Sequence, residues 1–404
     1  MNSPVLRRLL WVRGLRAFAD GYVSLLLPIY LMTLGMTALQ VGVMATGTLL
    51  GSGLFTLLVG WQAHRFTYRT QLLAACALMT ATGFGFAVFS DFWPLLVVAF
   101  IGTINPSSGD VSVFLPLEHA VLSHAVADRD RTALFARYSI VGATVAAFGS
   151  LCAGLPEVMA TAMHISMKTA LQAMFGLYGV IGLLSSWIYR PLPVEAGATT
   201  PVGASPLMKS KKVVYTLAAL FSLDALGGGL VVQSMLALWL FQKYQLSVLF
   251  TGALFFWTGL LSAFSYLIAV RLANRFGLVN TMVFTHLPSS ILLVLIPFMT
   301  SLNWAIALLL ARAVLSQMDV PTRSSYVMAI VPANERAAAA SVTSVPRSLA
   351  SAVGPLLAGY LLGVSPFGWP LVIAGALKIV YDLLLLRTFR TLRAPEEVQP
   401  DGAE

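Results

Sequence analysis

Charged residues stand inside otherwise apolar stretches of this sequence. The run 302–331 contains Arg312, Asp319 and Arg323, with Pro321 between the last two charges. At the centre of a bilayer one such charge costs at least ~2.5–3.5 kcal/mol, so it persists only beside water or a partner. Further charges deep within apolar runs are Arg16, Asp20, Asp110, Glu118 and Asp224. These residues are candidates for a path that carries protons or a polar solute.

The charges near Pro321 have two readings. Asp319 and Arg323 are four residues apart, so they can serve cargo and protons or neutralise each other on one helical face. Pro321 removes the backbone hydrogen bond to the carbonyl of Gln317 and predicts a kink there. We expect that kink to present the amide and the freed carbonyl of Gln317 to the path.

Two acids in the earlier runs are also candidates for the path. Asp110 follows the segment NPSSG, and irregular backbone at mid-depth is typical of a water-filled pathway. Asp20 lies four residues after Arg16 and can either pair with it or carry a proton.

Two further acids complete the candidates. Asp224 precedes the glycines at 227–229, which indicate either a flexible helix or close helix packing. Glu118 lies near the predicted cytoplasmic end of its run, where we expect it to bind loop arginines.

The elements that hold these charges are predicted to be membrane spans. Hydrophobic residues make up 58% of the 404 residues and charged residues 10%, whereas soluble domains average about 25% charged residues. A span needs about 20 apolar residues, and we expect an all-α polytopic protein in a lipid bilayer. The predicted spans are 11–34, 38–61, 70–90, 93–122, 134–156, 168–189, 213–241, 248–270, 279–300, 302–331, 338–363 and 367–388.

The net charge of +9 is unevenly distributed. With the N-terminus in the cytoplasm, most basic connector residues fall on that side, as the positive-inside rule requires. We therefore expect a multi-pass protein of the inner or plasma membrane with both termini cytoplasmic and no nucleic-acid partner. Cys76 and Cys152 fall within spans and no cluster has metal-ligand spacing, so no metal site is expected.

The two halves of the chain repeat each other on either side of the polar segment 190–212. The matched positions are Gly42 and Arg65 with Gly252 and Arg275, 23 residues apart in each half, Pro116 and Arg131 with Pro321 and Arg336, 15 residues apart, and Asp20 with Asp224. Internal repeats of helices are typical of secondary transporters.

The connector GWQAHRFTYRT, after the second span, resembles the first cytoplasmic signature of the major facilitator superfamily (MFS). Gly60, Arg65 and Arg69 match that signature, whereas His64 replaces its Asp and Thr67 replaces its second Gly. The resemblance implies a latch of charge pairs at helix ends, which His64 weakens.

Three further segments extend the resemblance over nearly the whole chain. VRLANRFG keeps Arg275 of the signature, while DRDRTALFARY and ANERAAAASV resemble the turns in which a basic residue opens the next helix. The resemblance implies a cytoplasmic gate that contains Gly60, Arg65, Arg69, Glu118, Arg131, Arg275 and Arg336.

The resemblance also implies the MFS fold, with 12 transmembrane helices in two pseudo-symmetric six-helix bundles. The implied parts are an N-terminal bundle at 1–190, a cytoplasmic linker at 191–212, a C-terminal bundle at 213–390 and a cytoplasmic tail at 391–404. Spans 1, 4, 7 and 10 would line the pathway. The candidate pathway residues on them are Asp20, Asp110, Asp224, Arg312, Gln317, Asp319 and Arg323.

These features predict a secondary active transporter, not an enzyme, that moves a small organic solute by alternating access as a monomer. We expect drug or metabolite efflux in exchange for protons, with a proton gradient and no cofactor. Span 5 lacks the Gly-Pro pair typical of drug antiporters, and Gly354–Pro355 stands in span 11 instead. The alternative is an uptake symporter or uniporter for a small anion held by Arg312 and Arg323. A membrane-embedded sensor or enzyme ranks below both.

Overall fold

The protein is described by a computed structural model. It describes residues 4–62, 66–107, 113–125, 131–193, 207–208, 210–332 and 335–389. These residues form α-helices and short 3-10 turns, and no strand occurs among them. Each predicted span is occupied by one helix or by two consecutive helices, which confirms the all-α membrane class.

The helices of the first half are α1 (Pro4–Thr33), α2 (Ala38–Gln62), α3 (Tyr68–Val88), α4 (Phe92–Ile101), α5 (Phe114–Ala125), α6 (Arg131–Leu151), α7 (Leu155–Ala162) and α8 (Met167–Tyr189). Side-chain caps fix two of the starts. The hydroxyl of Thr67 accepts a hydrogen bond from the backbone N–H of Thr70 before α3, and Ser166 does the same for Thr169 before α8. Such caps satisfy backbone donors that the first helical turn leaves open.

The helices of the second half are α9 (Lys211–Leu230), α10 (Gln233–Tyr244), α11 (Val248–Phe276), α12 (Leu278–Leu295), α13 (Leu302–Leu315), α14 (Asp319–Ile330), α15 (Arg336–Val364) and α16 (Trp369–Phe389). Among the described residues, ten helical stretches are long and apolar enough to cross a membrane, and α4 and α13 are shorter apolar helices.

Three of the four predicted pathway spans are interrupted. Span 4 is divided between α4 and α5, span 7 between α9 and α10, and span 10 between α13 and α14. The last break, a turn at residues 316–318, comes just before Pro321, where the sequence predicts a kink. Pro321 thereby lies in the first turn of α14, where a missing backbone N–H does not break a helical hydrogen bond.

The chain divides into two compact units. Unit 1 comprises Met1–Thr200, Val232–Gly259 and Pro355–Pro366, and unit 2 comprises Pro201–Val231, Leu260–Gly354 and Phe367–Glu404. The bundle boundaries predicted from the sequence stay a prediction, because unit 1 also includes segments of the second half.

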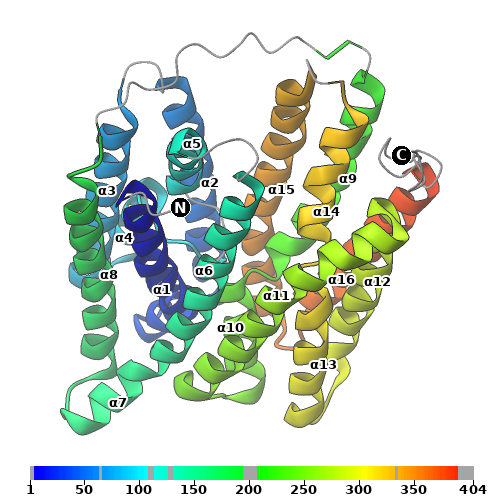
Figure 1. Ribbon diagram of the computed structural model, residues 1–404. Coiled ribbons are helices and arrows are strands. Elements are labelled where there is room, and N and C mark those ends of the chain that lie inside the picture. The colour runs from blue at the N-terminus through cyan, green and yellow to red at the C-terminus, as the bar shows by residue number, and fades with distance from the viewer. Residues whose placement is uncertain are drawn as a thin grey trace. The chain divides into compact units, whose positions relative to one another are not determined.

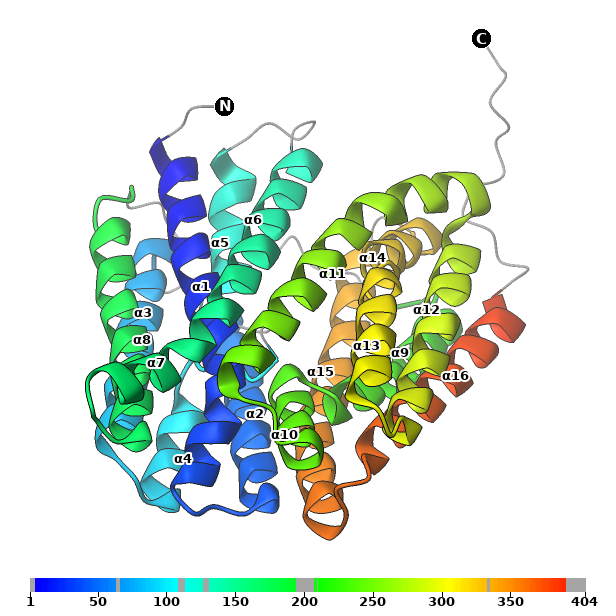
Figure 2. The same cartoon turned by 90° about the horizontal axis from the view of Figure 1, so that it is seen from below.

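Unit 1 is built around α1. This helix packs along α6 and α8, while α3 packs along α8 and α2 packs along α4 (Figure 2). Glycines bring helices into close contact. A Cβ atom on Gly21 would overlap the carbonyl oxygen of Ala146, and one on Gly149 would overlap that of Phe18. Close approach at small residues replaces hydrophobic driving force between helices in lipid.

Unit 2 is built around α16. This helix packs along α12 and α9, and α12 also contacts α13 and α14 (Figure 1). The glycines after Asp224 remain helical, and a Cβ atom on Gly229 would overlap the carbonyl oxygen of Ser351 in α15. In this conformation Gly229 therefore serves close packing between α9 and α15.

Candidate functional site

Asp224 is the centre of a buried group of charges in unit 2. Its Oδ1 atom lies 2.6 Å from Nζ of Lys378 in α16, and its Oδ2 atom lies 3.2 Å from Nη1 of Arg323 in α14. All three residues are buried. Buried charges are costly unless they are paired and hydrogen-bonded, so one carboxylate here holds three helices together.

Arg323 bridges two carboxylates. While Nη1 donates to Asp224, Nη2 donates to Asp319, which begins α14 one turn earlier. The ring of Phe221 lies beside the same guanidinium, 5.5 Å from ring centroid to Cζ. Asp319 and Arg323 therefore form the ion pair that their spacing allows, and this pair continues to Asp224. Whether it also serves transport stays a prediction.

His286 and Asp382 extend the group to α12. The Nδ1 atom of His286 lies 3.0 Å from each carboxylate oxygen of Asp382. On its other side, Nε2 lies 3.5 Å from Nζ of Lys378 and 3.6 Å from Oδ1 of Asp224. The imidazole is thus placed between two carboxylates and an ammonium group.

Together these residues form what we call the unit 2 charge network. Its members are Asp224, His286, Asp319, Arg323, Lys378 and Asp382. The three acids face two permanent cations, and a proton on His286 would supply a third positive charge. The protonation state of one imidazole therefore decides whether this set of groups is neutral.

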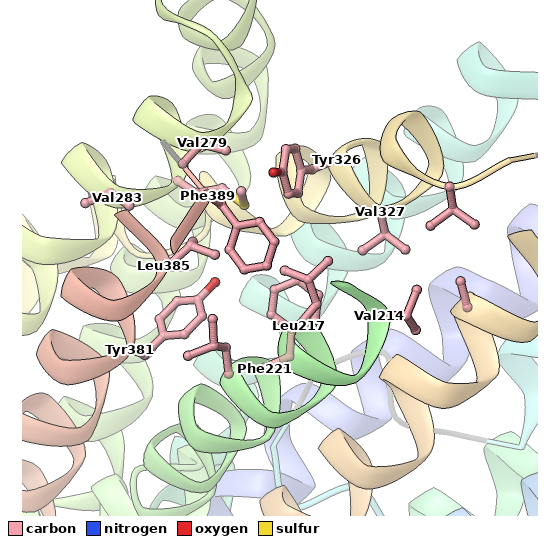
Figure 3. Packing of buried hydrophobic residues seen from close by; sticks show 14 residues of the cluster. Val214, Leu217, Phe221, Val279, Val283, Tyr326, Val327, Tyr381, Leu385 and Phe389 are labelled. Carbon is pink, nitrogen blue, oxygen red and sulfur yellow. The ribbon is translucent and has the colours of Figure 1, made fainter. Parts of the chain in front are cut away.

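An apolar cluster lies next to the network. Its members are Val214, Leu217, Leu220, Phe221, Val279, Met282, Val283, Tyr326, Val327, Val331, Ala339, Tyr381, Leu385 and Phe389. Figure 3 shows the rings of Phe221, Tyr381 and Phe389 gathered between α9 and α16. Phe221 and Tyr381 also touch the network, through Arg323 and His286 respectively. These two contacts place the apolar cluster against one side of the network.

Unit 1 contains its own buried ion pair, between Arg16 in α1 and Glu118 in α5. The Nη2 atom of Arg16 lies 2.6 Å from Oε2 of Glu118, and the hydroxyls of Tyr138 and Tyr189 also donate to this carboxylate. The guanidinium stacks on Phe114, 3.9 Å from Cζ to the ring centroid. The sequence predicts loop arginines as partners of Glu118; the structure gives it Arg16.

Each unit contains an ion pair at a repeat-related position, but the acid and the base have exchanged places between the two pairs. Glu118 stands two residues after Pro116, and Arg323 stands two residues after Pro321, its counterpart in the repeat. Each residue pairs with the first helix of its own half, Glu118 with Arg16 and Arg323 with Asp224.

The repeat-related glycines Gly42 and Gly252 each lie at a close contact between two helices within unit 1. A Cβ atom on Gly42 in α2 would overlap the carbonyl oxygen of Pro355 in α15. One on Gly252 in α11 would lie 2.5 Å from the carbonyl oxygen of Ser150 in α6. Next to the second contact, the carboxylate of Glu157 accepts hydrogen bonds from the backbone N–H groups of Val248 and Leu249, at 2.7 and 3.1 Å. An acid from α7 thus caps the start of α11.

A sequence profile described as the Major Facilitator Superfamily matches residues 9–241 and 217–404. The chain belongs to the major facilitator superfamily. A relative in Saccharomyces cerevisiae, described as an uncharacterised membrane protein, is 26% identical over 418 residues and covers 95% of this chain and 93% of its own length.

Solved MFS structures share the fold of this chain. The nucleoside transporter NupG superimposes with a TM-score of 0.72 at 13% identity, over 96% of this chain and 100% of NupG. A bacterial homologue of the human lysosomal transporter Spinster, in an inward-facing and occupied conformation, gives 0.74 at 16% identity, over 98% and 100% of the two chains. These likenesses confirm the predicted MFS fold, and the protein is a multi-pass membrane transporter of the MFS type.

The structure brings three of the predicted pathway residues together, Asp224, Asp319 and Arg323. Asp20 is buried in unit 1, one turn after Arg16. Asp110 lies outside the described residues.

The other two pathway candidates lie further along span 10. Arg312 is half-buried in α13, and its Nε atom has no hydrogen-bond partner in the described part of the chain. Gln317 is half-buried in the turn between α13 and α14, so the break does fall beside it.

The predicted gate residues are placed singly. Arg69 is half-buried in α3, and Arg275 and Arg336 are exposed at the end of α11 and the start of α15. Gly60 belongs to the last turns of α2 and Arg131 begins α6, but their side-chain positions are outside the described part, as is Arg65. A joint role at a gate stays a prediction for these residues.

Sequence reasoning did not include His286, Lys378 or Asp382 among the candidate pathway residues. A signal for His286 existed, because a titratable side chain in the middle of an apolar span marks a functional position by default. No spacing along the chain, however, predicts that α12 meets α9 and α16 at these residues.

Proposed function

We propose that this MFS protein is a proton-coupled secondary transporter that moves a small organic solute by alternating access. The observation that carries the proposal is the unit 2 charge network, in which a titratable imidazole lies within 3.6 Å of Asp224, Lys378 and Asp382. Buried ionisable groups of this kind mark proton relays and solute pathways in membrane transporters.

A proton on His286 would change the balance of the network. The imidazolium would compete with Lys378 for the carboxylate of Asp224, and this would weaken one of the bonds that join α9 to α16. Because Asp224 also holds Arg323, the change would reach α14 through the same carboxylate. Protonation at one helix would thus alter the contacts of three others, which is how a proton can bias two conformations.

For direction, we propose export of the solute in exchange for protons. The alternative from the sequence, uptake of an anion held by Arg312 and Arg323, is less well supported by this geometry, because two acids already bind Arg323. We further propose a monomer in the inner or plasma membrane with cytoplasmic termini and no cofactor.

Flux into proteoliposomes tests proton coupling. Liposomes with internal pyranine, a pH-sensitive dye, would contain the purified protein and receive organic carboxylates, amines and nucleosides in turn. The proposal expects at least one solute to move protons, and expects Asp224→Asn to abolish that signal. Solute flux that moves no protons and ignores an imposed pH gradient would refute it.

Direction needs a separate measurement in cells. Export predicts that expression protects cells from toxic members of the transported class and lowers their accumulation. Growth on a transported nutrient that depends on expression would support uptake instead.

A further inference from the structure

Arg347 is a cation within a membrane span that the charge network does not use. It lies on α15, and Ser351 and Gly354 follow it at spacings of four and seven residues on the same helical face. Both of those residues pack against Gly229 of α9. Arg347 therefore stands on the face of α15 that is turned toward α9.

The level of Arg347 along that face follows from two contacts. The starts of both helices meet in the apolar cluster, through Val214 of α9 and Ala339 of α15. Their later parts meet at Gly229 and Gly354. The two helices thus run in the same direction between these contacts, and Asp224 and Arg347 both lie in the stretch between them.

The surroundings of Arg347 are charged. Arg347 lies near enough to Arg323, Asp224 and Asp319 for their charges to act on its guanidinium. It forms no hydrogen bond or ion pair with any residue that the structure describes, and its side chain is exposed. The nearby acids are already bound by Arg323 and Lys378, so Arg347 is a spare cation beside the network.

We propose that Arg347 binds the carboxylate of the transported solute, so that the substrate class is small organic monoanions. This inference rests on the proposed transport function and names its substrate. An unpaired arginine within a membrane span is costly, and an anionic ligand would remove that cost. A guanidinium presents a planar pair of N–H donors that fits a carboxylate.

One spare cation also sets the charge of the ligand. When His286 is protonated, His286, Arg323 and Lys378 balance the three acids of the network, and the charge of Arg347 is left for the ligand. A single carboxylate meets one unpaired guanidinium, whereas a second negative charge would face Asp224 and Asp319. An anion also suits export, because an inside-negative membrane potential favours its exit by ~2.3 kcal/mol per 100 mV.

Binding to the purified full-length protein in detergent tests the assignment. The probes are benzoate, phenylacetate and hexanoate, each beside its neutral amide, and the readout is the rise of the melting temperature with probe concentration. The variants are Arg347→Gln and Arg347→Lys, with Arg387→Gln as a matched control, because Arg387 is also exposed but lies near the end of α16.

We expect at least one carboxylate to stabilise the wild type and the Arg387→Gln variant, while its amide does not. Arg347→Gln should weaken that binding about tenfold or more, because it removes a charge-assisted hydrogen bond. Arg347→Lys should weaken it less, because lysine keeps the positive charge. Equal effects of carboxylates and amides, no stabilisation by any carboxylate, or unchanged binding to Arg347→Gln would overturn the assignment. An Arg347→Gln variant that elutes as the wild type in gel filtration excludes misfolding.

The two proposals fail separately. Binding in detergent requires no gradient, so loss of binding in Arg347→Gln supports the carboxylate site even if flux proves independent of protons. Conversely, proton-coupled flux of a neutral solute would retain the proposed function and remove the carboxylate site.

Discussion

Lys378 donates from Nζ to Oδ1 of Asp224 across 2.6 Å, while Arg323 approaches the other oxygen of the same carboxylate at 3.2 Å. The two cations come from different helices, α16 and α14, and each binds a different oxygen of the carboxylate. Asp224 is therefore shared, and the loss of the acid differs from the loss of either base.

That asymmetry predicts unequal losses of stability. Asp224→Asn leaves Lys378 without its closest carboxylate, and we expect a cost of about 3–5 kcal/mol. Lys378→Met leaves Asp224 paired with Arg323, so its cost should be smaller, about 1–3 kcal/mol. Thermal unfolding in detergent measures both, and the double variant should lose less than the sum of the two. A larger loss for Lys378→Met than for Asp224→Asn would contradict the shared carboxylate.

A second prediction concerns the proton. His286→Gln keeps a polar side chain in α12 but cannot be protonated, although Asp382, Lys378 and Tyr381 of α16 and Asp224 of α9 still face it. We expect gradient-driven flux to fall at least about tenfold, while exchange of labelled for unlabelled solute without a gradient persists. Proteoliposomes prepared with and without a pH gradient separate the two activities. Equal losses of both would assign His286 a structural role instead.

The third prediction concerns unit 1. Glu118→Gln removes the charge opposite Arg16 but leaves a group that can still accept from Tyr138 and Tyr189. We expect a loss of about 3–5 kcal/mol, because the buried guanidinium then lacks its carboxylate. Adding Arg16→Met should recover part of the loss, and denaturation of the three variants measures it. If the second substitution makes the loss deeper, the pair is not the cause.

The fourth prediction concerns the contact between α11 and α6. Gly252→Val places a side chain against the carbonyl oxygen of Ser150, and we expect an overpacking cost of about 1–3 kcal/mol that separates the two segments. Cys152, half-buried two residues from Ser150, should then react faster with a membrane-impermeant maleimide in a Cys76→Ser background.

The matched control for this substitution is Gly53→Val, because no atom lies within 4 Å of a Cβ atom built on Gly53. It should leave the labelling rate unchanged. The same acceleration in the control would show that labelling reports general loosening and not the contact at Gly252.

The sequence predicted much of this fold, because each apolar run has to be about as long as the hydrocarbon core is thick. Pro321 also predicted the interruption of span 10, since a proline removes one specific backbone hydrogen bond. Asp224, Asp319 and Arg323 were found as charges within apolar runs, without knowledge of their neighbours.

The rest of the site depends on which helices meet. His286 joins Asp382, 96 residues later, and nothing in the spacing of either residue indicates that contact. Arg347 was overlooked because a single arginine hardly changes the hydropathy of a 29-residue helix. Its significance follows only from the packing of α15 on Gly229.

The reversed signs of the two related ion pairs have a consequence for how the chain assembles. In the first half the cation, Arg16, belongs to the opening helix, whereas in the second half the opening helix carries the acid, Asp224. If a helix of one repeat took the place of its counterpart, Arg16 would meet Arg323, or Asp224 would meet Glu118. Both encounters are repulsive, so the charges disfavour exchange of partners between two otherwise similar halves while the protein inserts into the membrane.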